Sequence, residues 1–172
     1  MVASIYRPLI MKLAHKGMDP LLIEAQVWVE SGSNPWAWNP EVKYKYLWNV
    51  KTNAPFRALK AFEDAGHVPA DFPTLGGDRD QEFWGQQASW GLLQIMGAVA
   101  REVGFTGVYL TALCDPTTGL IYALKHLAAL LQWAQGDESK ALAAYNGGRA
   151  FGAPSAAYAA KVLALKAQLP KV

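Results

Sequence analysis

The sequence predicts a mainly α-helical protein that folds as a single domain over residues 1–172. Several segments carry apolar residues at helical spacing, and a capping Asp or a terminating Gly bounds most of them. We find no convincing alternation of apolar and polar residues of the kind that indicates strands. We also find no internal repeat and no linker that would separate a second domain. A chain of this length buries about 70% of its unfolded surface on folding, which is enough for one stable core.

Local capping signals predict where the helices begin and end. Asp19 and Pro20 supply an N-cap and a first-turn proline, and Gly32 ends the helix that we expect between them. Residues 33–53 contain no sustained period, so we expect an ordered loop or short helical turns there. The other expected helices cover residues 55–65, 80–103, 116–135, 138–145 and a last segment from about residue 155.

Composition excludes several classes of function. The net charge is only +2 and no basic stripe is present, so a nucleic-acid partner is not expected. Cys114 is the only cysteine, which rules out an internal disulfide and a CxxC pair. His15, His67 and His126 are far apart in the sequence and lack metal-ligand spacing. We therefore expect neither a metal site nor a cofactor.

The N-terminal stretch "MVASIYRPLIMKLAHKGMDP" resembles neither a signal peptide nor a membrane anchor. Arg7, Pro8 and Lys12 interrupt its apolar runs, and no clear cleavage site follows them. The C-terminal run "AAYAAKVLALKAQLPKV" is best interpreted as a core helix with a solvated face, so stable membrane insertion is not expected. The protein is therefore expected either to be kept in the cytoplasm where it is made or to be delivered by another route.

Glu30 is the carboxylate with the most unusual setting, because it lies at the end of the expected helix 20–31 among aromatic and aliphatic residues. Ile23, Val27 and Glu30 share one helix face, which we expect to be buried or to line a cleft. The negative end of the helix dipole and the apolar neighbours both favour the protonated carboxyl. Such a group can act as a general acid near neutral pH. On position alone, a solvent-facing glutamate at a helix end is the simpler interpretation.

Three stretches favour the catalytic interpretation. "ESGSNPWA", "ASWGLLQIM" and "ALAAYNGG" occur in this order, each on or beside an expected helix. Together they resemble the three motifs of the lytic transglycosylase family related to the soluble bacterial enzymes, which shares the goose-type lysozyme fold. The resemblance spans residues 20–162. One motif alone would be weak evidence, whereas all three in order are strong evidence.

This resemblance implies a lysozyme-like fold and a peptidoglycan substrate. The implied reaction cleaves the β-1,4 bond between N-acetylmuramic acid and N-acetylglucosamine and leaves 1,6-anhydro ends. Glu30 would be the only catalytic carboxylate, acting first as acid and then as base. The family's helper positions, which would bind the glycan strand, correspond to Ser31, Gln94, Met96, Tyr145, Asn146 and Tyr158.

Simpler interpretations stand beside these roles. Met96 can pack in the core, Tyr145 can be a helix-end aromatic, and Asn146 with its two following glycines makes a helix stop. Gln94 is the best supported helper, because an amide just off an apolar stripe and close to Gly91 suits the wall of a groove. Six tryptophans are each expected in the core, with one or two of the set stacking on sugars, namely Trp28, Trp36, Trp38, Trp48, Trp84 and Trp90.

The sequence departs from the family pattern in two places. The span from Ser31 to Gly91 is longer than in typical bacterial members and includes an aromatic-rich insert at about residues 33–80. Gly97 stands where a proline often follows the "QIM" motif. The long insert and the N-terminal stretch resemble phage-encoded members that act in lysis or on the virion. This resemblance implies a monomer that is made in the host cytoplasm and acts on the cell wall.

Two alternative functions stay open. Asp78, Asp80 or Glu82 could supply a second carboxylate, and the enzyme would then be a muramidase that uses water. A helix cap by Asp80 and solvated positions for the other two are the simpler interpretation. The second alternative is a non-catalytic glycan-binding or virion protein on the same fold.

Overall fold

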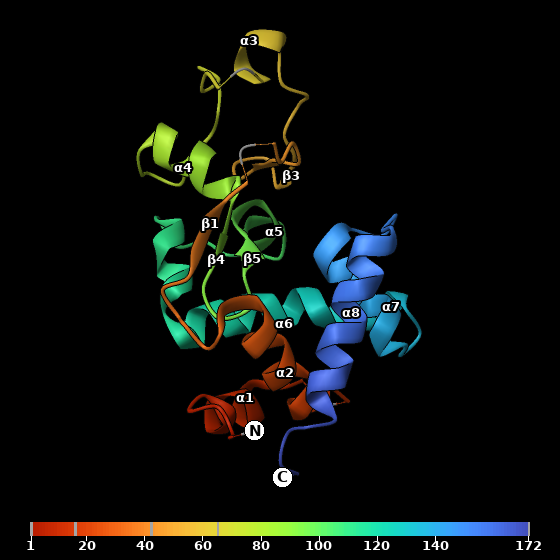
Figure 1. Ribbon diagram of the computed structural model, residues 1–172. Helices are drawn as coiled ribbons and strands as arrows, with labels where there is room; N and C mark the ends of the chain where they lie inside the picture. Colours follow the sequence, from red (N-terminus) through yellow and green to blue (C-terminus); the bar gives the residue numbers. More distant parts are fainter. Residues whose placement is uncertain (1, 16, 42, 65, 172) are drawn as a thin grey trace. The chain divides into compact units, whose positions relative to one another are not determined.

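The computed structural model describes residues 2–15, 17–41, 43–64 and 66–171. Within them the chain forms eight α-helices, one 3₁₀ helix and five strands of two or three residues (Figure 1). The predicted mainly α fold class is therefore confirmed. The chain divides into two compact units: unit 1 contains residues 1–34 and 123–172, and unit 2 contains residues 35–122. A single domain over residues 1–172 stays a prediction, and the two units are described separately.

Unit 1 is helical. It contains α1 (Arg7–Leu13), α2 (Pro20–Ser31), α7 (Glu138–Gly147), α8 (Ala153–Lys166) and the second part of α6 (Pro116–Trp133). Helix α8 contacts both α7 and α2, and Figure 1 shows α7 and α8 side by side. The buried residues that join these three helices are Leu22, Ala25, Leu142, Ala143, Ala159 and Val162. Packing of α8 against α2 brings the last helix of the chain to the first motif.

The predicted capping signals work as expected in unit 1. The Asp19 side chain accepts a hydrogen bond of 2.8 Å from the backbone N–H of Leu21 and so caps α2. Gly32 follows the last residue of α2 with a left-handed φ of 60°, which glycine adopts at little cost. Asp137 caps α7 by accepting from the backbone N–H of Lys140 at 2.9 Å. These contacts fix the ends of the two helices that carry "ESG" and "AYNGG".

Unit 2 contains the strands, which the sequence did not predict. Strands β1 (Trp38–Pro40), β4 (Ala88–Trp90) and β5 (Ile95–Met96) form an antiparallel sheet in the order β1-β4-β5. Strands β2 (Trp48–Asn49) and β3 (Ala54–Pro55) form a separate hairpin. Strands of this length show too few residues for an alternating pattern to be visible. The helices of the unit are α3 (Ala61–Asp64), α4 (Arg79–Gln86), α5 (Gly97–Glu102), the 3₁₀ helix η1 (Leu110–Cys114) and the start of α6.

Two helix predictions in unit 2 are wrong. The helix expected over residues 55–65 is only the single turn α3, because Pro55 lies in β3. The helix expected over residues 80–103 is split into α4 and α5 by the β4–β5 hairpin. Gly91 and Gln94 have left-handed φ values of 71° and 46° in that turn, which no continuous α-helix allows. The apolar spacing of Leu92 and Ile95 therefore comes from a buried turn rather than from a helix face.

The aromatic-rich insert is held to α4 by a buried amide. The Gln86 side chain accepts from the backbone N–H of Trp48 at 2.7 Å and donates to the carbonyl oxygen of Trp48 at 3.0 Å. Beside this pair, Leu47, Phe72 and Phe83 form a small buried cluster. The insert therefore shares a small core with α4 and packs as an ordered part of unit 2.

A buried ion pair joins α4 to α5. The Arg101 guanidinium donates to both carboxylate oxygens of Glu82, at 2.8 and 2.6 Å, and both side chains are almost fully buried. Arg101 also donates to the carbonyl oxygens of Phe105 and Gly107. The close approach of the two helices explains Gly97, because a Cβ there would lie 2.1 Å from the carbonyl oxygen of Gly85. The proline that often occupies this place in the family would clash.

None of the helices in the described ranges is long and apolar enough to cross a membrane.

The Glu82–Arg101 pair gives a stability prediction. Changing Glu82→Gln leaves a guanidinium buried without its counter-charge, and we expect the free energy of unfolding to fall by about 3 to 5 kcal/mol. The matched control is Asp64→Asn, which removes the partner of Lys45 in an exposed ion pair of 2.7 Å and should cost less than about 1 kcal/mol. Urea unfolding of the two variants measures both values. Equal effects would contradict the structural role assigned to the buried pair.

Candidate functional site

Glu30 lies in the last turn of α2, next to the left-handed Gly32. Its carboxylate oxygen Oε1 accepts a hydrogen bond of 2.5 Å from the Tyr158 hydroxyl of α8. The two residues are 128 positions apart in the sequence, and the packing of α8 against α2 brings them together. Ile23 and Val27, on the same face of α2, are fully buried, as the sequence predicted for that face.

The electrostatic setting of Glu30 makes its carboxyl a weak acid. Burial raises the pKa of Glu30 from its ordinary value of 4.5 to about 7, while the hydrogen bond from Tyr158 and the positive charge of Lys161 act in the opposite direction. Burial has this effect because the charged form loses its hydration. The direction agrees with the expectation from the apolar setting in the sequence. Both the acid and the base form are accessible near neutral pH, which suits a group that both gives and takes a proton.

Two tyrosines surround this carboxyl. Burial, followed by the charge of Glu30, raises the pKa of the Tyr158 phenol far above its ordinary range. The same two causes, in the same order, raise the pKa of Tyr145, in the last turns of α7. Both phenols therefore keep their protons at neutral pH and are available as hydrogen-bond donors to oxygen atoms.

The two other predicted site residues of unit 1, Ser31 and Asn146, lie at the ends of α2 and α7. The Ser31 hydroxyl donates to the backbone carbonyl oxygen of Val27 at 3.1 Å. Asn146 is exposed and precedes Gly147, the last residue of α7, so its position also fits the simpler role of a helix end.

Gln26 is a residue of the site that the sequence reasoning missed. It lies one helical turn before Glu30 on α2 and is fully buried. Its amide is close enough to the Tyr158 hydroxyl to counteract part of the rise in the pKa of Tyr158. Neither polar atom of this amide has a well-aligned hydrogen bond with another described residue. The sequence signal that could have identified Gln26 is an amide on an otherwise apolar helix face.

Gln94 and Met96 belong to unit 2. Gln94 lies in the turn between β4 and β5, rather than on the helix expected there. Its amide donates to the carbonyl oxygens of Ala37 and Gly91, at 3.0 and 2.8 Å, and accepts from the Ser89 hydroxyl at 2.9 Å. Its left-handed φ of 46° is uncommon for a residue other than glycine, and such strained positions cluster at functional sites. Met96 pairs directly with Ser89, so the two side chains share one sheet face.

The predicted site residues therefore form two groups. Unit 1 brings Glu30 together with Tyr158 and Tyr145, and unit 2 joins Gln94 to Ser89 on the sheet edge that carries Met96. Ser89 is the second residue that sequence reasoning did not single out. Its place inside the "ASWGLLQIM" motif was the available signal.

The exposure of the tryptophans tests the prediction that each of them lies in the core. Trp48 and Trp90 are buried, as expected for core residues. The core prediction is wrong for three others, because the exposed fraction is 74% for Trp36, 55% for Trp38 and 40% for Trp84. Trp28 is half-buried against the core of unit 1.

The acidic residues considered as a second carboxylate have other roles in unit 2. Asp78 caps α4 by accepting from the backbone N–H of Gln81 at 2.9 Å, so the cap expected at Asp80 is two positions too late. Asp80 is exposed beside Arg79. The carboxylate of Glu82 is fully engaged by Arg101 and Gln86. No group of three or more His, Cys, Asp or Glu residues with metal-binding geometry occurs in the described ranges.

Comparison with known proteins identifies a family. The model of the family described as Transglycosylase SLT domain matches residues 7–162. The match covers most of the chain and includes all three motifs. No curated protein and no solved structure matched the chain significantly.

The raised pKa of Glu30 predicts how stability changes with pH. A carboxyl whose pKa is 4.5 unfolded and about 7 folded binds more protons in the folded state, so stability falls as the pH rises through this window. The Glu30→Gln variant lacks this dependence. The free energy of unfolding of this variant, minus that of the parent, should therefore rise by about 3 kcal/mol between pH 4 and pH 8, as the size of the pKa shift of Glu30 implies. Urea unfolding across this range measures the difference, and a difference that does not vary with pH would contradict the assigned pKa.

Proposed function

Since the chain belongs to the transglycosylase SLT domain family, whose members degrade peptidoglycan as lytic transglycosylases, we propose that Glu30 is its sole catalytic acid and base. The fold is the mainly α, lysozyme-like fold of that family. The observation that carries the proposal is the half-buried Glu30 carboxyl, with its hydrogen bond from Tyr158 and its pKa near 7. The substrate bond is the β-1,4 linkage between N-acetylmuramic acid and N-acetylglucosamine.

In the first step Glu30 is the acid. Its proton passes to the oxygen of the glycosidic bond while the bond from that oxygen to C1 of the muramic acid residue breaks. The N-acetylglucosamine side leaves with a free hydroxyl. A pKa near 7 keeps a large fraction of Glu30 protonated at neutral pH, which an exposed glutamate would not do.

In the second step Glu30 is the base. The carboxylate accepts the proton of the sugar's own 6-hydroxyl as its oxygen attacks C1, which gives the 1,6-anhydro ring and restores the acid. No water is consumed, and the tethered hydroxyl gains the advantage of proximity over a free water molecule. The Tyr158 hydroxyl donates to Glu30 and favours its charged form, so it supports the state that this step requires.

The helper residues are proposed to bind the glycan strand on either side of the reacting bond. Tyr145 and Tyr158 offer protonated phenols, while Ser31 and Asn146 offer short polar groups at the ends of α2 and α7. Gln94 and Met96 are proposed to form a wall of the groove. The support for Gln94 is its strained backbone and its link to Ser89.

The biological setting is also a proposal. The ordered, aromatic-rich insert favours a phage-encoded enzyme that acts as a monomer on the host cell wall, in lysis or on the virion. Expression of the gene in a phage-free bacterium, followed by release of its cell contents only with a phage holin, would support the lysis role.

Glu30→Gln keeps the size of the side chain and removes the transferable proton. We expect clearing of a peptidoglycan suspension to slow by about 10²-fold or more, the usual contribution of general acid catalysis. The matched control is Glu138→Gln, which removes a carboxylate of the same unit that pairs with Lys166 and should clear at the parent rate. Clearing by the Glu30 variant within a few-fold of the parent would favour the non-catalytic alternative.

The reaction products separate the transglycosylase from a muramidase. If Glu30 works alone, mass spectra of digested peptidoglycan should show 1,6-anhydro-N-acetylmuramic acid ends, each lighter by one water than a reducing end. Asp78→Asn and Asp80→Asn should retain most activity, because Asn also caps helices and Asp80 is exposed. Reducing muramic acid ends, with loss of activity in one of these two variants, would instead identify a hydrolase with a second carboxylate.

A further inference from the structure

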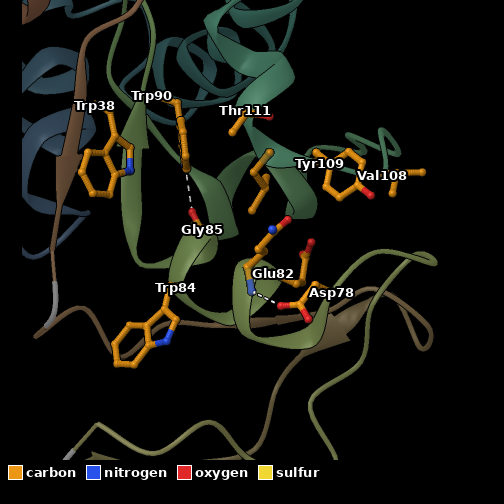
Figure 2. Close-up of a pocket in the computed structure, with 11 residues that line it drawn as sticks. Trp38, Asp78, Glu82, Trp84, Gly85, Trp90, Val108, Tyr109 and Thr111 are labelled. Carbon is orange, nitrogen blue, oxygen red and sulfur yellow. Dashed lines mark hydrogen bonds between the residues drawn. The ribbon is translucent and has the colours of Figure 1, made fainter.

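Unit 2 contains a pocket of about 200 Å³ that the proposed reaction does not use. Figure 2 shows it between the sheet, helix α4 and the segment that leads into η1. Trp38 and Trp90 line it from the sheet, Trp84 lines it from α4, and Tyr109 lines it from the segment before η1. All of these residues belong to unit 2, so the pocket is complete within that unit.

The pocket lies on the sheet face opposite the motif residues. Trp38 pairs with Trp90, whereas Ser89 pairs with Met96. Directly paired residues share a face, and neighbours along a strand point to opposite faces. Trp90 therefore points away from the face that carries Ser89 and Met96. The pocket is thus separate from the groove wall proposed for Gln94.

One wall of the pocket is a buried aromatic ring, and exposed aromatic side chains form its rim. Trp90 is buried, and its indole N–H donates to the carbonyl oxygen of Gly85 at 2.9 Å, as Figure 2 shows. The rings of Trp38 and Trp90 have centroids 6.0 Å apart. Trp38, Trp84 and Tyr109 are 55%, 40% and 52% exposed. Exposed aromatic side chains grouped around one pocket are typical of a binding site.

The charges around the pocket restrict the kinds of ligand that it can bind. Among the described residues, no lysine, arginine or histidine lines it. The polar groups at its edge are the Asp78 carboxylate, the Gln81 amide and the Thr111 hydroxyl. The Glu82 carboxylate also lies there but is engaged by Arg101. This set can bond to hydroxyl and amide hydrogens, and it repels a carboxylate or a phosphate.

We propose that this pocket binds a neutral N-acetylglucosamine unit of the glycan strand, as a second site apart from the reacting bond. The C–H face of a pyranose ring stacks on an indole, and the N-acetyl methyl group fits an apolar wall. The muramic acid unit, with its carboxylate or peptide, lacks a counter-charge here. The identity of the ligand rests on the proposed peptidoglycan function, and the site would hold the enzyme on the wall between cleavage events.

The test uses the Glu30→Gln protein, which binds sugar without turnover, and the soluble tetramer of N-acetylglucosamine as probe. Indole N–H signals in NMR spectra report on each tryptophan separately. We expect the signals of Trp38 and Trp84 to shift with a Kd on the order of 1 mM, a typical strength for a small neutral ligand in a shallow site. Trp38→Ala and Trp84→Ala should each weaken this binding at least about five-fold, from the value of one aromatic contact. The matched control is Phe62→Ala, an aromatic residue that is 56% exposed in the same unit and does not line the pocket.

Activity measurements on the protein that retains Glu30 separate the proposed second binding site from the proposed catalytic function. Trp38→Ala and Trp84→Ala should clear intact peptidoglycan several-fold more slowly while they cleave short soluble glycan fragments at the parent rate. Both tryptophans are exposed, and thermal unfolding checks that the variants stay folded. Indole signals that do not move with the tetramer, or tighter binding of an anionic muramyl peptide than of the tetramer, would overturn the proposal. Neither result would alter the catalytic role of Glu30, which the clearing assay of Glu30→Gln tests.

Discussion

The partial burial of the Glu30 carboxyl without a directly paired positive charge is the interaction on which the proposed chemistry of unit 1 depends. Three glutamates in the described residues are buried, Glu24, Glu63 and Glu82, and each is paired with an arginine. Glu24 accepts from Arg7 at 2.6 Å, and Glu82 accepts two hydrogen bonds from Arg101. Glu30 instead receives a neutral phenol, while the charge of Lys161 acts without a direct contact. The ion pairs of Glu24 and Glu82 hold helices together, whereas the setting of Glu30 leaves a carboxyl that can change its protonation state near neutral pH.

The helices of unit 1 were predictable because their signals are local. Asp19, Gly32 and Asp137 act within one turn of the helix ends that they define, so the sequence contains the whole cause. The setting of Glu30 was predictable in direction for the same reason, since Val27 and Ile23 share its helix face. The hydrogen bond from Tyr158 was available only as a family resemblance. Helix α8 must pack on α2 before the two groups meet, and no local pattern encodes that contact.

Unit 2 was predicted less well, because its structure depends on contacts between distant residues. Strands of two or three residues carry no readable alternation, and the apolar spacing around Leu92 imitated a helix. Gly97 seemed a departure from the family pattern, yet the backbone of Gly85 leaves no room for a Cβ there. The exposure of Trp38 and Trp84 could not be predicted from the sequence either. Tryptophan is buried in general, and composition gives no information about individual positions.

Two unfavourable polar interactions of unit 1 lie where the chemistry is proposed. Gln26 is buried with an amide that lacks a well-aligned partner among the described residues, and it lies one turn from Glu30 on α2. Deprotonation of Glu30 adds a further cost above the ordinary pKa of a glutamate. Both groups face Tyr158, whose phenol interacts with each of them. A helix chosen for stability alone would carry apolar residues at both positions. The core that joins α2, α7 and α8 offsets these costs, which is the usual relation between a rigid scaffold and a strained site.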